Sequence, residues 1–123
     1  MTRLTLPAGT LAACLLFGTA AHAEVTNLEC KSPSDPDGPV YPLYWVDFDK
    51  NVVSYGNMEN GRPGHVDTYP AQISDSSISF QIGSWHIFID RKSGENTWAG
   101  GMDQRYICEK GNVPLPAPPP NKF

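Results

Sequence analysis

Cysteine is the residue type in this sequence best suited to covalent chemistry, and it occurs as Cys14, Cys30 and Cys108. No C-x-x-C pair is present, so thioredoxin-like redox chemistry is not expected. Cys14 falls in an N-terminal stretch that is interpreted below as a leader. The remaining pair, Cys30 and Cys108, predicts one disulfide that closes a loop of 79 residues.

The other reactive residue types do not gather into a known catalytic or metal-binding pattern. Asp35 and Asp37 form a D-P-D-G turn without the later ligands of a calcium loop. His65 and His86 are the two histidines beyond the leader, and their spacing matches no zinc motif. A G-x-S-x-G nucleophile elbow is also missing from the sequence. We therefore expect no enzymatic activity, no metal site and no cofactor.

Two aromatic residues, Trp45 and Phe88, are the candidates for a binding surface. Strand alternation places each on the face opposite the apolar set of its own strand. If their hairpins are neighbours, both rings would be exposed and would form one apolar patch, which is typical of protein contacts. The alternative is that Pro39, Pro42 or the C-terminal segment covers them.

The segment from Asp90 to Gly94 predicts a structural turn at the end of a strand. The Asp90 carboxylate can accept hydrogen bonds from the backbone N–H groups that follow it. Gly94 can supply a position with positive φ. We interpret both residues as structural rather than as parts of a site.

These residues need elements to position them, and the hydrophobic pattern predicts strands throughout. Apolar residues recur with period 2 and are interrupted by Gly, Pro, Asn and Asp. The sequence therefore predicts an all-β fold: a small antiparallel meander of about eight strands that closes into a barrel or a sandwich. The disulfide would join the first and last strands. The expected strands are 25–31, 41–48, 51–57, 65–73, 77–82, 85–90, 96–99 and 104–110, with a loop at 58–64.

Two hairpin registers follow from the turn residues. Gly83-Ser84 suits a two-residue type II′ turn, which pairs Ile82 with Trp85 and gathers six large apolar residues on one face. With Lys50-Asn51 as a second two-residue loop, Phe48 would face Val53. Pro70 interrupts 65–73, which indicates an edge strand or a bulge.

The first 23 residues predict a secretory signal peptide. Arg3 precedes an uncharged run, and Ala21-His22-Ala23 is a small-x-small site with cleavage expected after Ala23. That run of about 18 residues is too short for a stable membrane span, which needs roughly 20. Leu11 to Cys14 resembles a lipobox, so a lipoprotein anchored through Cys14 is the alternative. The organisation expected is 1–23 signal peptide, 24–112 β-domain and 113–123 proline-rich disordered tail.

Composition limits the functional classes. The chain has 123 residues and a net charge of −4, which becomes −5 when Arg3 is removed with the leader. This length suits one domain. An acidic balance argues against nucleic acid as a partner, because phosphate binding needs clustered Lys and Arg. We expect a monomer in the periplasm or the secreted fraction.

The leader, the early Cys30, the Ile89–Gly94 segment, the late Cys108 and the Lys122-Phe123 end together resemble small exported proteins of Gram-negative bacteria that have no assigned activity. The predicted β-fold with a disulfide between its first and last strands also resembles periplasmic lysozyme inhibitors of the C type. Those inhibitors carry a Ser-Gly-x-x-Tyr loop, and this chain has Ser93-Gly94 with Thr97 in the place of the Tyr. The second resemblance implies a basic partner such as a lysozyme, which an acidic surface would suit.

The expected function is a non-enzymatic binding module for a protein or an envelope component, with an inhibitor-like role as one form of it. The alternative is a small-ligand carrier, whose apolar residues would line a cavity inside the barrel. The size of the interior pocket separates the two, because the many aromatic side chains of so short a chain tend to fill a barrel.

Overall fold

The computed structural model describes residues 25–117, which form strands and loops without a helix. Short runs of period-2 apolar residues account for the strands, since alternate side chains point to opposite faces of a sheet. The strands are β1 (Val25–Lys31), β2 (Leu43–Asp47), β3 (Val52–Gly56), β4 (Met58–Glu59), β5 (Arg62–Pro63), β6 (Asp67–Pro70), β7 (Gln72–Ile73), β8 (Ser77–Ile82), β9 (Trp85–Asp90), β10 (Glu95–Ala99) and β11 (Gln104–Lys110).

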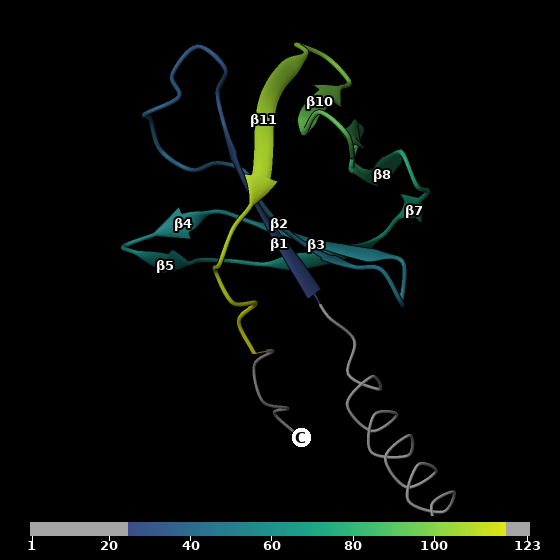
Figure 1. The fold of residues 1–123 in the computed structure, drawn as a ribbon, viewed down its shortest axis with the longest axis horizontal. Helices are drawn as coiled ribbons and strands as arrows, with labels where there is room; N and C mark the ends of the chain where they lie inside the picture. The colour runs from purple at the N-terminus through teal and green to yellow at the C-terminus, as the bar shows by residue number, and fades with distance from the viewer. Residues whose placement is uncertain (1–24, 118–123) are drawn as a thin grey trace, which may run out of the picture.

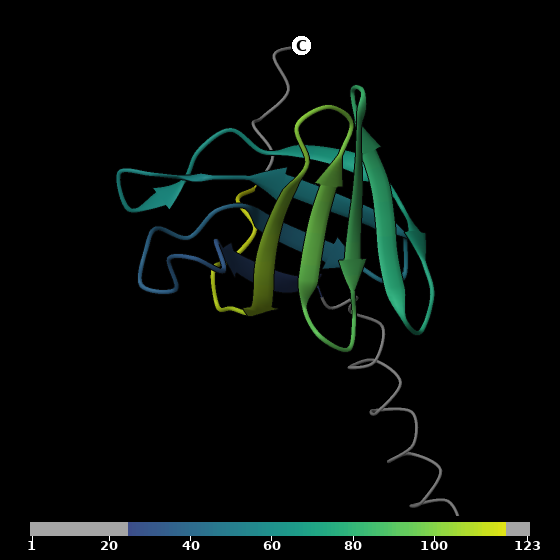
Figure 2. The ribbon, with the colours of Figure 1, turned by 90° about the horizontal axis from the view of Figure 1, so that it is seen from above.

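Nine of these strands form one antiparallel sheet that is nearly closed into a barrel (Figure 1). The order is β6-β3-β2-β1-β11-β10-β9-β8-β7, so strands that follow one another along the chain are mostly neighbours. Figure 2 shows β8 to β11 as one wall and β1 to β3 as the wall behind it. The predicted all-β meander is confirmed, and the barrel rather than the sandwich is its form.

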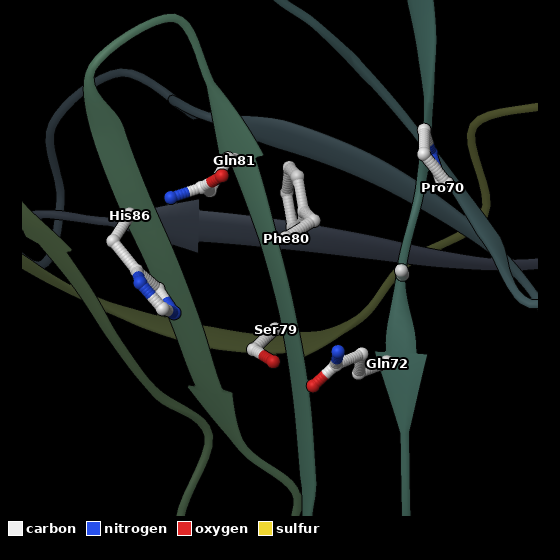
Figure 3. Close-up of a pocket in the computed structure, with 7 residues that line it drawn as sticks. Pro70, Gln72, Ser79, Phe80, Gln81 and His86 are labelled. Carbon is white, nitrogen blue, oxygen red and sulfur yellow. The ribbon is translucent and has the colours of Figure 1, made fainter.

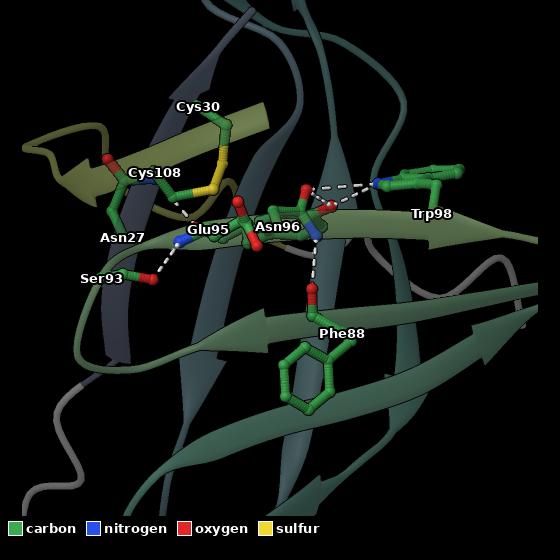
Figure 4. Close-up of a disulfide and its surroundings, with 9 residues drawn as sticks. Asn27, Cys30, Phe88, Ser93, Glu95, Asn96, Trp98 and Cys108 are labelled. Carbon is green, nitrogen blue, oxygen red and sulfur yellow. Dashed lines mark hydrogen bonds between the residues drawn. A yellow bond between two sulfur atoms is a disulfide. The ribbon is translucent and has the colours of Figure 1, made fainter. Parts of the chain in front are cut away.

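The predicted disulfide is confirmed at the junction of the first and last strands. Cys30 of β1 lies directly opposite Cys108 of β11, and their sulfur atoms are bonded (Figure 4). Both residues are buried inside the barrel. The bond therefore reinforces a pair of strands that are far apart in the chain.

The β8–β9 hairpin has the predicted register. Ile82 pairs with Trp85, and Phe80 pairs with Ile87. Gly83 begins the turn with a φ of 60°, which the first central residue of a type II′ turn requires. The alternation of the two strands thus directs their large apolar side chains into the barrel.

The predicted register of the β2–β3 hairpin is wrong by two residues. Val46 pairs with Val53, and the loop contains four residues instead of two. The reason is Asp47, whose carboxylate accepts hydrogen bonds from the backbone N–H groups of Asp49 and Lys50 at 3.0 Å each. These bonds turn the chain before Phe48 can pair. A shift of two residues preserves the faces, so the inward set is still correct.

The predicted strand 65–73 is divided into β6 and β7, which form the two edges of the sheet. β6 pairs with β3, β7 pairs with β8, and Ala71 connects them. Pro70 stands at this corner, where its missing N–H costs no ladder bond. Inside the barrel the rings of Tyr69 and Phe80 stack with centroids 6.2 Å apart. We call this place the seam, because side chains rather than a ladder of hydrogen bonds close the barrel along it.

The predicted loop at 58–64 contains a small hairpin, β4–β5, which projects from the barrel in both views (Figures 1 and 2). Asn60 and Gly61 have φ values of 53° and 82°. Two successive residues with positive φ are typical of a type I′ turn, for which Asn-Gly is the preferred sequence.

A buried polar network lies inside the barrel. The Tyr44 hydroxyl donates to Asn96 Oδ1 at 2.8 Å and accepts from Trp98 Nε1 at 2.9 Å. Asn96 Nδ2 donates to the carbonyl of Phe88 at 3.0 Å (Figure 4). Burial raises the pKa of Tyr44 well above its usual value. Because every member has a partner, the network adds specificity to a core that is otherwise apolar.

The chain beyond β11 remains attached to the barrel at its start. Val113, which we expected to begin a disordered tail, donates its N–H to Asn27 Oδ1 at 3.0 Å. The residues of the expected signal peptide, with Cys14 and the cleavage site after Ala23, and the end of the chain from 118 onward lie outside the described residues. In the segment from 25 to 117 no helix is long and apolar enough to cross a membrane.

Candidate functional site

The predicted patch of Trp45 and Phe88 does not exist. Trp45 faces outward from β2 as expected, but it is only 2% exposed. Its Nε1 donates to the carbonyl of Val113 at 2.8 Å, so the segment after β11 lies across it. Asn27 holds that segment from the neighbouring strand. The prediction of an exposed Trp45 is therefore wrong because residues after β11 cover it, which is the alternative that the sequence left open.

Phe88 is exposed as predicted, at 42% of its surface. It faces away from the barrel interior on β9 (Figure 4). β1, β11 and β10 lie between its strand and β2 in the sheet. Phe88 is therefore an isolated surface side chain, which is common in soluble proteins.

A different feature lies at the end of the barrel where β2, β9 and β11 finish, and we call it the basal mouth. It is a pocket of about 330 Å³. Its floor consists of inward-facing side chains from four strands, namely Leu28, Val46, Ile78 and Ile89, with Cys108 of the disulfide beside them. Leu28 is only partly buried, while the other three apolar residues are at most 2% exposed. The floor is thus the closed end of the hydrophobic core, with Leu28 as its partly exposed side chain.

Cationic side chains surround this apolar floor. Arg91, Lys92 and Lys110 line the mouth, together with the carboxylates of Asp90 and Glu109. Residues 25–117 contain seven basic and twelve acidic residues, so three of seven cations but only two of twelve carboxylates lie here. The rim is therefore locally positive on an acidic protein.

Arg91 is the cation with a defined position. Its guanidinium carbon lies 4.7 Å from the centroid of the Phe48 ring, within the range of a cation–π interaction. Its Nη1 donates to the carbonyl of Ser74 at 2.5 Å, and its backbone N–H donates to Ser76 at 2.9 Å. Three loops are thus tied together at the rim, which presents Arg91 in one place.

The turn that carries Arg91 forms as predicted. Asp90 Oδ1 accepts the N–H of Lys92 at 2.8 Å and that of Ser93 at 3.1 Å, and these bonds lower the pKa of Asp90. Gly94 has a φ of 82°, and its carbonyl accepts the N–H of Cys108 at 2.8 Å. A Cβ at Gly94 would come within 2.2 Å of the Cys108 carbonyl oxygen. Glycine is required here because the turn presses against β11.

The opposite end of the barrel is filled with aromatic rings. Tyr55 meets Trp98 edge to face at 5.4 Å between centroids, and Trp85 meets Trp98 at 5.7 Å. Tyr41 packs in the same way against Tyr106, at 5.9 Å. Burial and the neighbouring Tyr41 hydroxyl raise the pKa of Tyr55. The basal mouth, by contrast, lies against the aliphatic part of the core.

A second pocket, of about 590 Å³, lies on the outside of the seam (Figure 3). The side chains around it come from both edges of the sheet and include Gln72, Ser79, Gln81 and His86. They offer amide, hydroxyl and imidazole groups without a charged partner among the lining residues. This lining can hydrogen-bond a ligand but has no arrangement suited to nucleophilic or acid–base catalysis.

No protein-family model, curated protein or solved structure matches this chain. Within the described part of the chain there is also no group of three or more side chains that could hold a metal ion. The basal mouth combines residues that the sequence did not bring together, above all Leu28, Phe48 and Lys110. One signal was present in the sequence: Arg91-Lys92 is a pair of adjacent cations in an acidic chain, directly after a strand.

Proposed function

We propose that this chain is a non-enzymatic binding module that holds a protein or an envelope component at its basal mouth. One observation carries the proposal: the partly exposed Leu28 and the exposed ring of Phe48 lie in an open pocket that is surrounded by Arg91, Lys92 and Lys110 on a chain of net charge −4. An exposed apolar surface with a polar rim is typical of interaction sites. The module would act as a monomer.

The packing of the barrel favours this function over the small-ligand carrier. A carrier encloses its ligand, and small-molecule sites span about 300–1,000 Å³. The mouth has about 330 Å³ and is open, while aromatic rings occupy the rest of the interior. A carrier remains the second candidate because the volume lies at the lower end of that range.

Location in the periplasm or the secreted fraction belongs to the same proposal. The disulfide between Cys30 and Cys108 is compatible with an oxidising compartment, where such bonds persist. An inhibitor-like role would use the same face, because Ser93 and Gly94 line the basal mouth. In that case the target would be a protein that inserts an apolar or acidic group between the loops.

Affinity capture with matched variants tests the proposal. The protein is produced from its full coding sequence, purified with the disulfide formed, immobilised and exposed to an envelope extract. The mouth variant is Lys92→Gln combined with Lys110→Gln, since both side chains are exposed and their loss leaves the core intact. The control is Arg62→Gln, which removes a cation from the projecting β4–β5 hairpin.

The expected result is a component that the wild type and the control retain and that the mouth variant loses. Retention that is unaffected in the mouth variant but lost in Phe88→Ser would place the binding face on β9 instead. Failure of the wild type to retain any component would contradict the binding function itself.

A further inference from the structure

We propose that the basal mouth takes a single-chain amphiphile with a compact anionic head group, such as a carboxylate. This inference rests on the proposed function and specifies the chemistry of its ligand. The alkyl chain would lie on the floor of the mouth, and the head group would lie among the cations of the rim.

The floor is suited to hydrocarbon. Leu28 is partly exposed in the pocket and the ring of Phe48 is exposed at its edge. The buried aliphatic side chains of Val46, Ile78 and Ile89 close the pocket beneath them. Burying an alkyl chain against such a surface is favourable by about 25 cal/mol per Å² of apolar area removed from water. A polar ligand such as a sugar would gain no hydrogen bond from these side chains.

The rim is suited to an anion. The Arg91 guanidinium has five N–H donors, and the Ser74 carbonyl occupies one of them, so donors remain for a carboxylate. Lys92 and Lys110 add two exposed cations. The carboxylate of Asp90 is held by two backbone N–H groups of its own turn, which offsets its repulsion of a second anion.

The ring of Phe48 argues against a cationic or aromatic head group. Arg91 already lies over this ring, at 4.7 Å from its centroid. A quaternary ammonium would have to displace Arg91 and would then face Lys92 and Lys110. The rim therefore selects against positive charge.

The size of the opening selects a single chain. A volume of about 330 Å³ lies at the lower end of the range for small-molecule sites. Aromatic rings fill the barrel beyond the floor, so a long chain or two parallel chains would extend into solvent. A medium-length alkyl chain uses the apolar area that the mouth offers.

Isothermal titration calorimetry with four probes below their micellar concentrations tests the inference. The probes are decanoate, decyl maltoside, decyltrimethylammonium and acetate. Decanoate should bind most tightly. Decyl maltoside should bind more weakly, because its head group carries no negative charge. Decyltrimethylammonium and acetate should bind least, because the first has a cationic head group and the second has no alkyl chain. Added salt should weaken the binding of decanoate and leave that of decyl maltoside nearly unchanged.

Variants separate the floor from the rim. The double variant Lys92→Gln with Lys110→Gln should raise the Kd for decanoate by about tenfold and should leave the Kd for decyl maltoside unchanged. Leu28→Trp should abolish the binding of both by filling the floor. Arg62→Gln should change neither. If Leu28→Trp loses the β-sheet signal in circular dichroism, amide shift mapping with decanoate replaces it, and the shifts should concentrate at residues 89–94.

Equal affinities for decanoate and decyl maltoside, or for the wild type and the rim variant, would overturn the selection of an anion. Amide shifts centred on the seam would place the ligand in the wrong pocket and would also overturn the inference. If decanoate does not bind but the envelope component still depends on Lys92 and Lys110, the binding module stands and its ligand is not an amphiphile. If that dependence is missing too, both proposals fail.

Discussion

The buried network around Asn96 makes a quantitative prediction about two substitutions of similar size. In Tyr44→Phe the hydroxyl is removed, but Trp98 Nε1 keeps Asn96 Oδ1 as an acceptor at 3.3 Å. No buried donor or acceptor is left without a partner, so the cost is one net hydrogen bond. We expect a loss of about 1–2 kcal/mol in the free energy of unfolding.

Asn96→Leu keeps the volume of the side chain but removes the centre of the network. The Tyr44 hydroxyl loses its acceptor, and the carbonyl of Phe88 loses the Asn96 Nδ2 donor. Leaving a buried polar group unsatisfied costs about 1–3 kcal/mol, so we expect a total loss of roughly 3 kcal/mol. The double variant should lose at least the sum of the two, because Trp98 Nε1 then loses both of its acceptors, the Tyr44 hydroxyl and Asn96 Oδ1.

Urea denaturation with the disulfide intact measures these differences, provided that the slopes are equal among the variants. Tyr69→Phe is a control, because Tyr69 is a half-buried tyrosine whose ring stacks on Phe80. It should stay within about 0.5 kcal/mol of the wild type. The reasoning is refuted if Tyr44→Phe is as costly as Asn96→Leu, or if the double variant loses clearly less than the sum of the two single variants.

Three further predictions concern the Cys30–Cys108 disulfide, the covered side chain of Trp45 and the turn that begins at Asp90. Replacing Cys30 and Cys108 together by Ser should lower the free energy of unfolding by about 4 kcal/mol, measured by denaturation against the oxidised wild type, because the loop of 79 residues is no longer closed. An unchanged midpoint would contradict this. Trp45→Phe should cost about 1 kcal/mol through the lost bond to the Val113 carbonyl, and limited proteolysis should then cleave the segment after β11 faster; equal cleavage rates would show that the bond does not hold it. The pKa of Asp90 is lowered in the folded state, so its contribution to stability is present above the unfolded value near 3.8 and is lost as the pH falls through the folded value. Asp90→Asn should remove that part of the acid dependence, as thermal melts across this pH range would show, and an identical acid profile in the variant would argue against it.

The parts of the fold that depend on short-range signals could be predicted from the sequence. Gly83-Ser84 permits one tight turn, and the register of β8 and β9 follows from it. The pairing of Cys30 with Cys108 follows from the even count of cysteines beyond the predicted leader. The predicted β2–β3 register was wrong because the hydrogen bonds that the Asp47 carboxylate accepts from the following backbone N–H groups replace the two-residue turn. The Asn60-Gly61 signal of β4–β5 was present but belongs to strands of only two residues each.

The site depended on long-range geometry, which period-2 patterning does not contain. Alternation correctly placed Trp45 on the outer face, but the segment near Val113 that covers it lies 68 residues away. The basal mouth draws its lining from β1, β2, β8, β9 and β11. Its composition becomes visible only when the order of the strands around the barrel is known.

The position of β1 has a consequence for the order in which the barrel is assembled during synthesis. β1 is the first strand to leave the ribosome, yet one of its two neighbours is β11, the last. At about 5–20 residues per second, the 78 residues from Lys31 to Cys108 take roughly 4 to 16 s to be made. Throughout this interval the nascent sheet has an open edge at β1. Every truncated chain that lacks β11 keeps that edge, so the sheet cannot be completed before β11 is available for pairing.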